Sequence, residues 1–190
     1  MTDRITDEKL KNKRFKKTEE AIIMAFFLAK DKLSLKRLLQ LAKISRSTLY
    51  RHHKNLTEIV PDYEKYILKK CKNYMKPLIK KDESRLKTLY QRILIFMVAN
   101  RFIIEFLLKN GSQNIIERIV KALKPMILAS GKVTDGEMFK IYTKEVAAII
   151  EEWCRLGFKK DDILPTTYKI MYLTDQAYIR LSPLKSFNKT

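Results

Sequence analysis

The sequence predicts an all-α protein, and three observations lead to this prediction. The 190-residue chain contains only 4 Gly and 5 Pro, the residues that most often interrupt helices. Its apolar residues recur at helical spacing, and no stretch alternates apolar and polar residues as a strand would. Hydrophobic residues make up 46% of the chain, which is enough to bury a core without disulfides.

The charge of the chain favours an anionic partner. The formal net charge is +19, and residues 1–60 hold fifteen Lys and Arg against seven Asp and Glu. Such an excess suits DNA, RNA or an anionic membrane. A generally Lys-rich composition explains the excess after residue 60 equally well. The N-terminus is charged and shows no apolar signal core, and the longest apolar run, residues 21–29, is shorter than the roughly 20 residues that span a bilayer. Without paired Cys spacing, we expect a soluble, cytoplasmic protein.

Three helices are expected in the first 60 residues. Residues 1–14 are expected to form a frayed terminus. The alternative is an arm that approaches DNA. Residues 15–30 carry apolar side chains at helical spacing. Residues 34–42 and 46–52 then form two short amphipathic segments around a break at residues 43–45, and Leu49, with or without Tyr50, can pack on the first segment. Two helices joined by such a turn, the second polar and cationic, are what a major-groove reader needs.

Longer helices are expected after residue 55. Asn55 and Glu58 form a capping pair, and Pro61 predicts a kink or a restart near Val60. Further helices are expected to about residue 80, from residues 82–84 to 108 with a bend or split at Asn100-Arg101, from 115 to 128, from 134 to 156, and from 161 to 181.

The segment 34–58 resembles the helix-turn-helix of the tetracycline-repressor (TetR) family. The matching positions are Ser34-Leu35, Leu38-Leu39, Ala42, Lys43-Ile44-Ser45, Arg46–His53, Asn55 and Glu58. Three positions depart from the family pattern, because Lys43 replaces the usual turn glycine, His53 the usual Phe and Leu56 a basic residue. The resemblance implies a three-helix DNA-binding domain at residues 1–58 and a larger helical ligand-binding and dimerisation domain at residues 59–190.

The resemblance also implies which residues contact DNA. Arg46 and Arg51 would meet guanine edges or phosphates, and Lys36 and Lys54 would meet phosphates. His52 is expected to contact DNA and His53 to pack. The full expected set is Ser34, Lys36, Ser45, Arg46, Ser47, Thr48, Tyr50, Arg51, His52 and Lys54.

The sequence gives no sign of catalysis. His52 and His53 are the only histidines, and adjacent helical residues point about 100° apart. No Cys, Asp or Glu is spaced along the sequence to complete a metal site with them. A phosphate-binding loop, a nucleophile elbow and a catalytic carboxylate pair are also missing from the sequence. We therefore expect no enzyme activity, no metal and no cofactor.

The C-terminal helices carry the remaining expectations. Aromatic, Met and polar residues there suggest a small-molecule site, with ordinary core packing as the alternative. An Arg101 that faced a cavity would indicate an anionic ligand. The expected ligand-binding residues are Tyr74, Phe96, Met97, Arg101, Met126 and Trp153. In the family, the last two helices pair with their copies as a four-helix bundle, which implies a homodimer on a palindromic operator.

These features predict a dimeric transcriptional regulator, by family default a repressor, that responds to an unidentified small molecule. An alternative is a protein of the same fold without a working pocket, which acts through a protein partner or as an accessory DNA binder. A third is a basic helical protein that associates nonspecifically with RNA or membranes.

Overall fold

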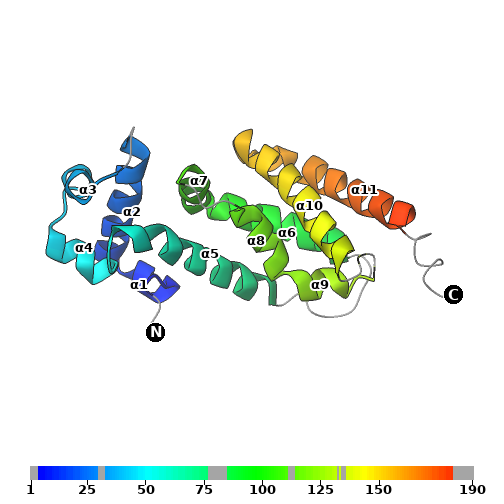
Figure 1. Cartoon of the computed structure of the whole chain (residues 1–190), viewed down its shortest axis with the longest axis horizontal. Helices are drawn as coiled ribbons and strands as arrows, with labels where there is room; N and C mark the ends of the chain where they lie inside the picture. Colours follow the sequence, from blue (N-terminus) through cyan, green and yellow to red (C-terminus); the bar gives the residue numbers. More distant parts are fainter. Residues whose placement is uncertain are drawn as a thin grey trace. The chain divides into compact units, whose positions relative to one another are not determined.

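The structure is a computed structural model that describes residues 4–29, 33–76, 85–110, 114–131, 133 and 136–181. These residues form α-helices and short 3-10 helices, with no β-strand among them (Figure 1). The all-α prediction is confirmed. The chain divides into two compact units, unit 1 with residues 1–69 and 102–113 and unit 2 with residues 70–101 and 114–190.

Unit 1 is built from helices at the start of the chain and from one later helix. Its elements are α1 (Asp7–Lys11), α2 (Lys13–Leu28), α3 (Leu35–Ala42), α4 (Arg46–His52), η1 (Leu56–Glu58), the first part of α5 (Ile59–Met75), and α7 (Arg101–Lys109) from Phe102 onward. The DNA-binding domain predicted at residues 1–58 lies within unit 1, which extends further along the chain.

The first residues of the described chain are ordered. The hydroxyl of Thr6 caps α1 by accepting from the amide of Lys9, and Ile5 is buried. Tyr66 in α5 donates to Asp7 Oδ1 at 2.7 Å, which ties α1 to the rest of unit 1. The frayed terminus predicted for residues 1–14 is therefore wrong from residue 4 onward.

Helix α2 is the central helix of unit 1. Asn12 caps it, so it begins slightly earlier than predicted, and its apolar side packs on α3. Phe26 meets Phe106 of α7 edge to face, with ring centroids 5.1 Å apart. Lys109 in α7 donates to the carbonyl of Phe27 at 2.9 Å and so supplies a partner for the end of α2.

Helix α5 starts at Ile59, after the 3-10 turn η1. Asn55 Oδ1 accepts from the amide of Glu58 at 3.0 Å, as the capping pair predicted. The restart places Pro61 in the first turn of α5, where backbone amides have no partner inside the helix in any case. The predicted restart is confirmed, and Pro61 removes no hydrogen bond from the helix interior.

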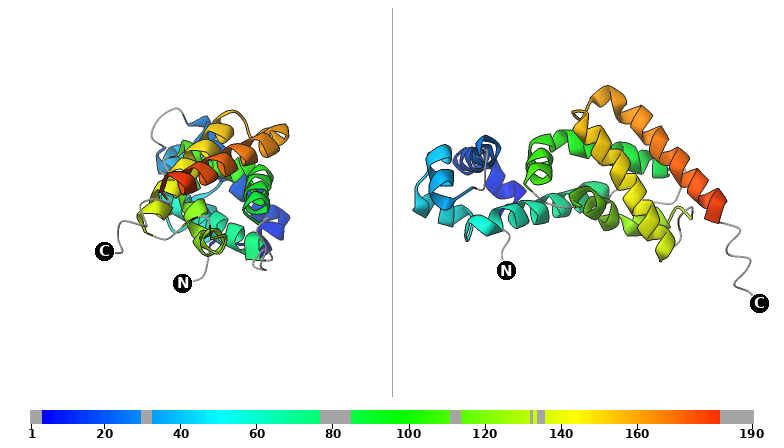
Figure 2. Two further views of the ribbon diagram at one scale, coloured as in Figure 1. Left: turned by 90° about the vertical axis from the view of Figure 1, so that its right-hand side faces the viewer. Right: turned by 45° about the horizontal axis from the view of Figure 1, so that its top comes forward.

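Unit 2 contains the two longest helices of the described chain, α10 (Glu137–Arg155) and α11 (Ile163–Leu181), with 19 residues each. Its other elements are the end of α5, α6 (Arg85–Ala99), α8 (Ile115–Ala122), α9 (Lys124–Leu128) and η3 (Lys160–Asp162). Helices α10 and α11 pack on each other as two antiparallel arms that meet at the turn containing η3 (Figure 2). Helix α8 also packs on α10, and α6 packs on α11.

The predicted split at Asn100 is confirmed. Helix α6 ends at Ala99, and the amide side chain of Asn100 donates to the carbonyl of Phe96 at 2.7 Å. The predicted helix start at residues 82–84 and the predicted start at residue 134 lie outside the described residues. In the part of the chain that is described, no helix is long and apolar enough to span a bilayer.

Candidate nucleic-acid interface

Helices α3 and α4 are joined by three residues, and hydroxyl groups define where each helix begins. Ser34 Oγ accepts from the amide of Arg37 at 3.2 Å, and Ser45 Oγ accepts from the amide of Thr48 at 3.1 Å. Between the helices, Lys43 adopts the left-handed conformation with φ 52° and ψ 44°. The backbone thus needs positive φ at the position where the family pattern has glycine.

Each helix turns its apolar side inward. Leu38 and Leu49 are fully buried, and Ala42 is 7% exposed. Ten residues were predicted to contact DNA, and nine of them are exposed or half-buried: Ser34, Lys36, Ser45, Arg46, Ser47, Thr48, Tyr50, Arg51 and Lys54. These nine residues are called the reading face below. Tyr50, which could have packed inward, is 41% exposed.

Side chains on the reading face form hydrogen bonds with one another along α4. The Arg46 guanidinium donates from Nε to the Tyr50 hydroxyl at 3.3 Å, one helical turn further on. Arg51 donates to Thr48 Oγ1 at 3.3 Å, and Ser45 Oγ lies 2.8 Å from the same hydroxyl oxygen. Both guanidinium groups are thus held over neutral hydroxyls, where a nucleic acid can replace these exposed contacts.

All charged side chains of the reading face are positive. Residues 32–57 contain no Asp or Glu, so no acidic side chain of this segment neutralises its Lys and Arg residues. Two more exposed cations, Arg37 and Lys43, flank the predicted set. An excess of Lys and Arg around a short polar helix attracts phosphates, as in proteins that bind nucleic acids.

The structure corrects the prediction for His52. Its ring is buried and stacks on Phe15, with centroids 4.2 Å apart and an interplanar angle of 19°. Its Nδ1 lies 2.6 Å from Glu19 Oε1. His52 points into unit 1, because it lies three residues after Leu49 on the apolar side of α4, and we remove it from the reading face. The prediction that His53 packs in the core is confirmed, since His53 is fully buried.

Glu19 of α2 accepts hydrogen bonds from three aromatic side chains. His52 donates to one carboxylate oxygen, and His53 and Tyr63 donate to the other, with His53 Nε2 at 3.1 Å. The second ring nitrogen of His53, Nδ1, lies 2.8 Å from Asp62 Oδ2 in α5. We call these five residues the His53 network. They come from α2, from α5, and from the end of α4 with the residue that follows it.

Hydrogen bonding outweighs burial in this network. Burial alone would raise the pKa of Glu19, yet the bonds from His52, His53 and Tyr63 and the charge of His53 lower that pKa to about 2. Burial would likewise lower the pKa of His53, but Glu19 and Asp62 raise it above its ordinary value. For Tyr63, burial and the Glu19 charge both raise the pKa. Glu19 is therefore ionised over the whole physiological range.

Sequence reasoning missed Glu19 and Asp62 as histidine partners, because Glu19 lies 33 residues before His52. The only signal was a Glu on the apolar side of the predicted first helix, between Phe15 and Ile22. The donor atoms of the network face carboxylate oxygens at hydrogen-bond distance, and the described residues contain no group of three or more His, Cys, Asp or Glu suited to a metal ion.

The six predicted ligand-binding residues all lie in unit 2, and four of them take part in two separate groups of ring contacts. Tyr74 packs on the buried Phe96 with ring centroids 5.6 Å apart, and Met97 is buried beside Phe96 in the sequence of α6. In the second group, the Arg101 guanidinium lies 5.6 Å from the ring of Phe158. Arg101 itself is exposed, and Met126 in α9 is half-buried.

Trp153 belongs to the second group and connects it to a groove. It packs on Phe158 with ring centroids 5.4 Å apart and donates to the carbonyl of Lys159 at 3.2 Å. Phe158 was not among the predicted residues. It comes directly after Gly157, which follows the end of α10, and it has a positive φ of 54°. Of the six predicted residues, Trp153 is the one that lines this groove.

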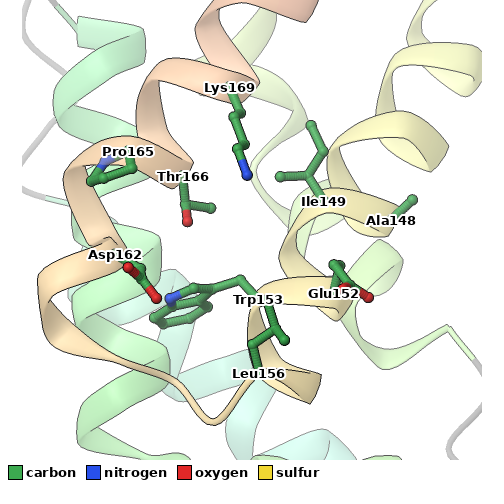
Figure 3. A pocket seen from close by; sticks show the side chains of 9 residues that line it. All are labelled: Ala148, Ile149, Glu152, Trp153, Leu156, Asp162, Pro165, Thr166 and Lys169. Carbon is green, nitrogen blue, oxygen red and sulfur yellow. The ribbon is translucent and has the colours of Figure 1, made fainter.

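The groove has a volume of about 560 Å³ and is partly open to solvent. It lies between the end of α10 and the start of α11 (Figure 3). Its lining combines apolar side chains with three charged ones: Ala148, Ile149, Glu152, Trp153, Leu156, Asp162, Pro165, Thr166 and Lys169. Figure 3 shows the ammonium group of Lys169 reaching across the groove from α11 toward α10.

Comparisons with protein-family models, with curated protein sequences and with solved structures found no match to this chain. The class of protein is therefore inferred from its own residues.

Proposed function

We propose that this chain is a non-enzymatic, sequence-specific DNA-binding transcriptional regulator of the TetR type, acting as a homodimer. The observation that carries the proposal is α4, which buries Leu49 and His52 and presents Arg46, Ser47 and Arg51 outward. Short polar side chains beside two guanidinium groups let a helix approach base edges closely while arginine pairs with guanine. Repression is the default activity of the family that the segment resembles.

The cationic flanks of α4 support the same proposal. Ser34 and Ser45 are the N-cap residues of α3 and α4, and along the chain Lys36 precedes the reading helix and Lys54 follows it. Such groups fix the register of a protein on a duplex by contacting phosphates and carry no sequence information of their own. They explain why α4 needs only a few side chains to read bases.

Unit 2 would then hold the control site. We include in the proposal a small-molecule effector that binds among the aromatic residues of unit 2 and shifts the affinity for the operator. One supporting detail is Tyr90 in α6, whose fully buried hydroxyl has no hydrogen-bond partner among the described residues. A buried, unpaired hydroxyl favours a state in which a ligand or a water molecule supplies the missing bond.

The experiment that tests the proposal is selection of preferred sequences from a random DNA pool with the purified chain. We expect a pseudo-palindrome bound at least about 10³-fold more tightly than random duplex at the same salt concentration. The Arg46→Ala/Arg51→Ala variant serves as the matched control and should lose this preference. Compounds that release the protein from the selected duplex would identify the effector class.

A preference ratio near one, with binding that disappears as salt rises, would contradict the proposal. That result would favour a nonspecific basic RNA- or membrane-associated protein. No binding to any duplex would favour the remaining alternative, a protein of the same fold that acts through a protein partner.

A further inference from the structure

The position of α4 depends on very few contacts. The helix has seven residues, and its buried side chains are Leu49 and His52. A helix this short is not stable alone, so its orientation is set by what it packs on. Of these two, His52 is hydrogen-bonded to Glu19. The residue that follows the helix, His53, is hydrogen-bonded to Glu19 and to Asp62.

The geometry around His53 requires a positively charged ring. Nδ1 lies 2.8 Å from Asp62 Oδ2, and Nε2 lies 3.1 Å from Glu19 Oε2. A neutral imidazole has one N–H donor and one lone pair, and the lone pair would face a carboxylate oxygen that can only accept. With a proton on each nitrogen, His53 donates to both carboxylates and joins α2 to α5 at the end of α4.

Among the described residues, the charged groups bonded to His53 are the carboxylates of Glu19 and Asp62. Glu19 approaches from α2, and Asp62 and Tyr63 approach from α5, with His52 beside them at the end of α4. Tyr63 packs on the uncharged ring of Phe106 in α7, and its neighbour Tyr66 donates to Asp7 of α1. If His53 loses its proton, two largely buried carboxylates face a neutral ring, and one hydrogen bond is lost.

We infer that Glu19 and His53 are positioning residues for DNA reading, and that the doubly protonated ring of His53 holds α4 in its reading orientation until rising pH removes that proton. This inference rests on the proposed function for its biological output. Neither residue lies on the reading face, so each affects DNA binding indirectly, through the orientation of α4.

The direction of the pH dependence follows from the two shifted groups. The pKa of His53 is raised above its ordinary 6.5, so its contribution is fully present below about pH 6.5 and is lost as pH rises through the folded-state pKa. The pKa of Glu19 is lowered from 4.5 to about 2, so its contribution is fully present above about pH 4.5 and is lost on acidification toward pH 2. Both contributions are complete between about pH 4.5 and 6.5, and the network weakens on the alkaline side.

The first test compares Glu19→Gln with Glu20→Gln. Both variants remove one carboxylate from α2, but Glu20 is half exposed and, within the described part of the chain, pairs with Lys16 at the surface. At pH 6 we expect Glu19→Gln to bind the selected operator at least about tenfold more weakly, a change of ~1.4 kcal/mol or more. Glu20→Gln should stay within about twofold of wild type. Equal affinities for wild type and Glu19→Gln, with equal pH profiles, would overturn the inference.

The second test needs no variant, so a failure of Glu19→Gln to fold does not affect it. In the full-length wild-type chain, nitrogen NMR of the imidazole rings should show His53 protonated at both nitrogens at pH 6 and titrating above 6.5. Operator affinity should fall over the same alkaline interval. A His53 ring that is neutral at pH 6 would overturn the inference even if the operator is bound. A protonated ring in a chain that binds no operator would instead count against the proposed function.

Discussion

Lys43 carries a backbone conformation that its side chain disfavours. Its φ of 52° places the Cβ of an L-residue close to the following carbonyl, and the described contacts of this residue at the end of α3 come from its backbone amide. The family pattern that the segment resembles has glycine, which adopts positive φ without strain, at this position. Lysine at this position therefore lowers stability. Its ammonium group adds a positive charge to the turn before α4.

Replacing Lys43 with glycine should stabilise the protein. We expect Lys43→Gly to raise the free energy of unfolding by about 0.5–1 kcal/mol, because glycine adopts positive φ without strain but loses more chain entropy on folding. The measurement is urea unfolding followed by circular dichroism. Lys36→Gly is the matched control, since it removes the same side chain from inside α3 and should lower stability by about 1 kcal/mol. A loss of stability in both variants would show that Lys43 is not strained.

His52 and Glu19 mark the limit of sequence reasoning about the site. The pattern around Ser45–Tyr50 predicted which residues stand on the exposed side of α4, because helical spacing fixes their directions. It could not predict that His52 turns inward, because its partner Glu19 lies 33 residues away in the sequence. From the sequence alone, a glutamate in a helix is expected to be exposed. That Glu19 is buried depends on how α2, α4 and α5 pack together.

Helices α3 and α4 should make different contributions to DNA binding. Arg46 stands at the first position of α4, close to where recognition helices meet base edges, whereas Lys36 stands near the beginning of α3. Arginine can form two bonds to one guanine, and a lysine at a helix start meets a phosphate. Removing Arg46 and removing Lys36 each delete one positive charge, but the two variants should show different defects in DNA binding.

Arg46→Ala should cost about 1–3 kcal/mol of operator affinity and relax the preference at one base pair of each half-site. Lys36→Ala should weaken binding to all sequences alike and reduce the slope of log affinity against log salt by about 1. Binding titrations at several salt concentrations, on the operator and on single-base variants, distinguish the two. Lys72→Ala in α5, also an exposed lysine, should leave both quantities unchanged. A uniform loss in Arg46→Ala would assign Arg46 to a phosphate.

The order and limits of the helices were largely predictable, while their tertiary partners were not. Restarts at Asn100 and Pro61 follow from local chemistry, because an amide side chain and a proline act on backbone groups a few residues away. That α7 belongs to unit 1 depends on Phe106 meeting Phe26 and Tyr63, contacts between residues far apart in the sequence. Apolar periodicity says that α7 has a buried side, but it does not say which helix covers it.

At the scale of the whole molecule, the proposed function requires two copies of the chain. A palindrome presents its half-sites about 34–36 Å apart or at a multiple of that distance, which one reading face cannot contact twice. Unit 2 offers a surface for pairing on α11. Leu164, Tyr168 and Tyr172 recur every four residues on this helix and are 46%, 52% and 65% exposed. Exposed apolar side chains gathered on one face of a helix are a candidate interaction surface.

Tyr172 is the most exposed of these three side chains, and substituting it tests the dimer. In a two-fold interface the same patch serves both copies, so Tyr172→Glu introduces two carboxylates that lose water on pairing. We expect Tyr172→Glu to shift the chain from dimer to monomer in sedimentation equilibrium and to weaken operator binding at least about 100-fold, because each half-site is then bound alone. Tyr172→Phe keeps the apolar ring and should behave as wild type. A Tyr172→Glu chain that stays dimeric would exclude this surface, and a monomeric wild type at operator-saturating concentration would exclude the dimer.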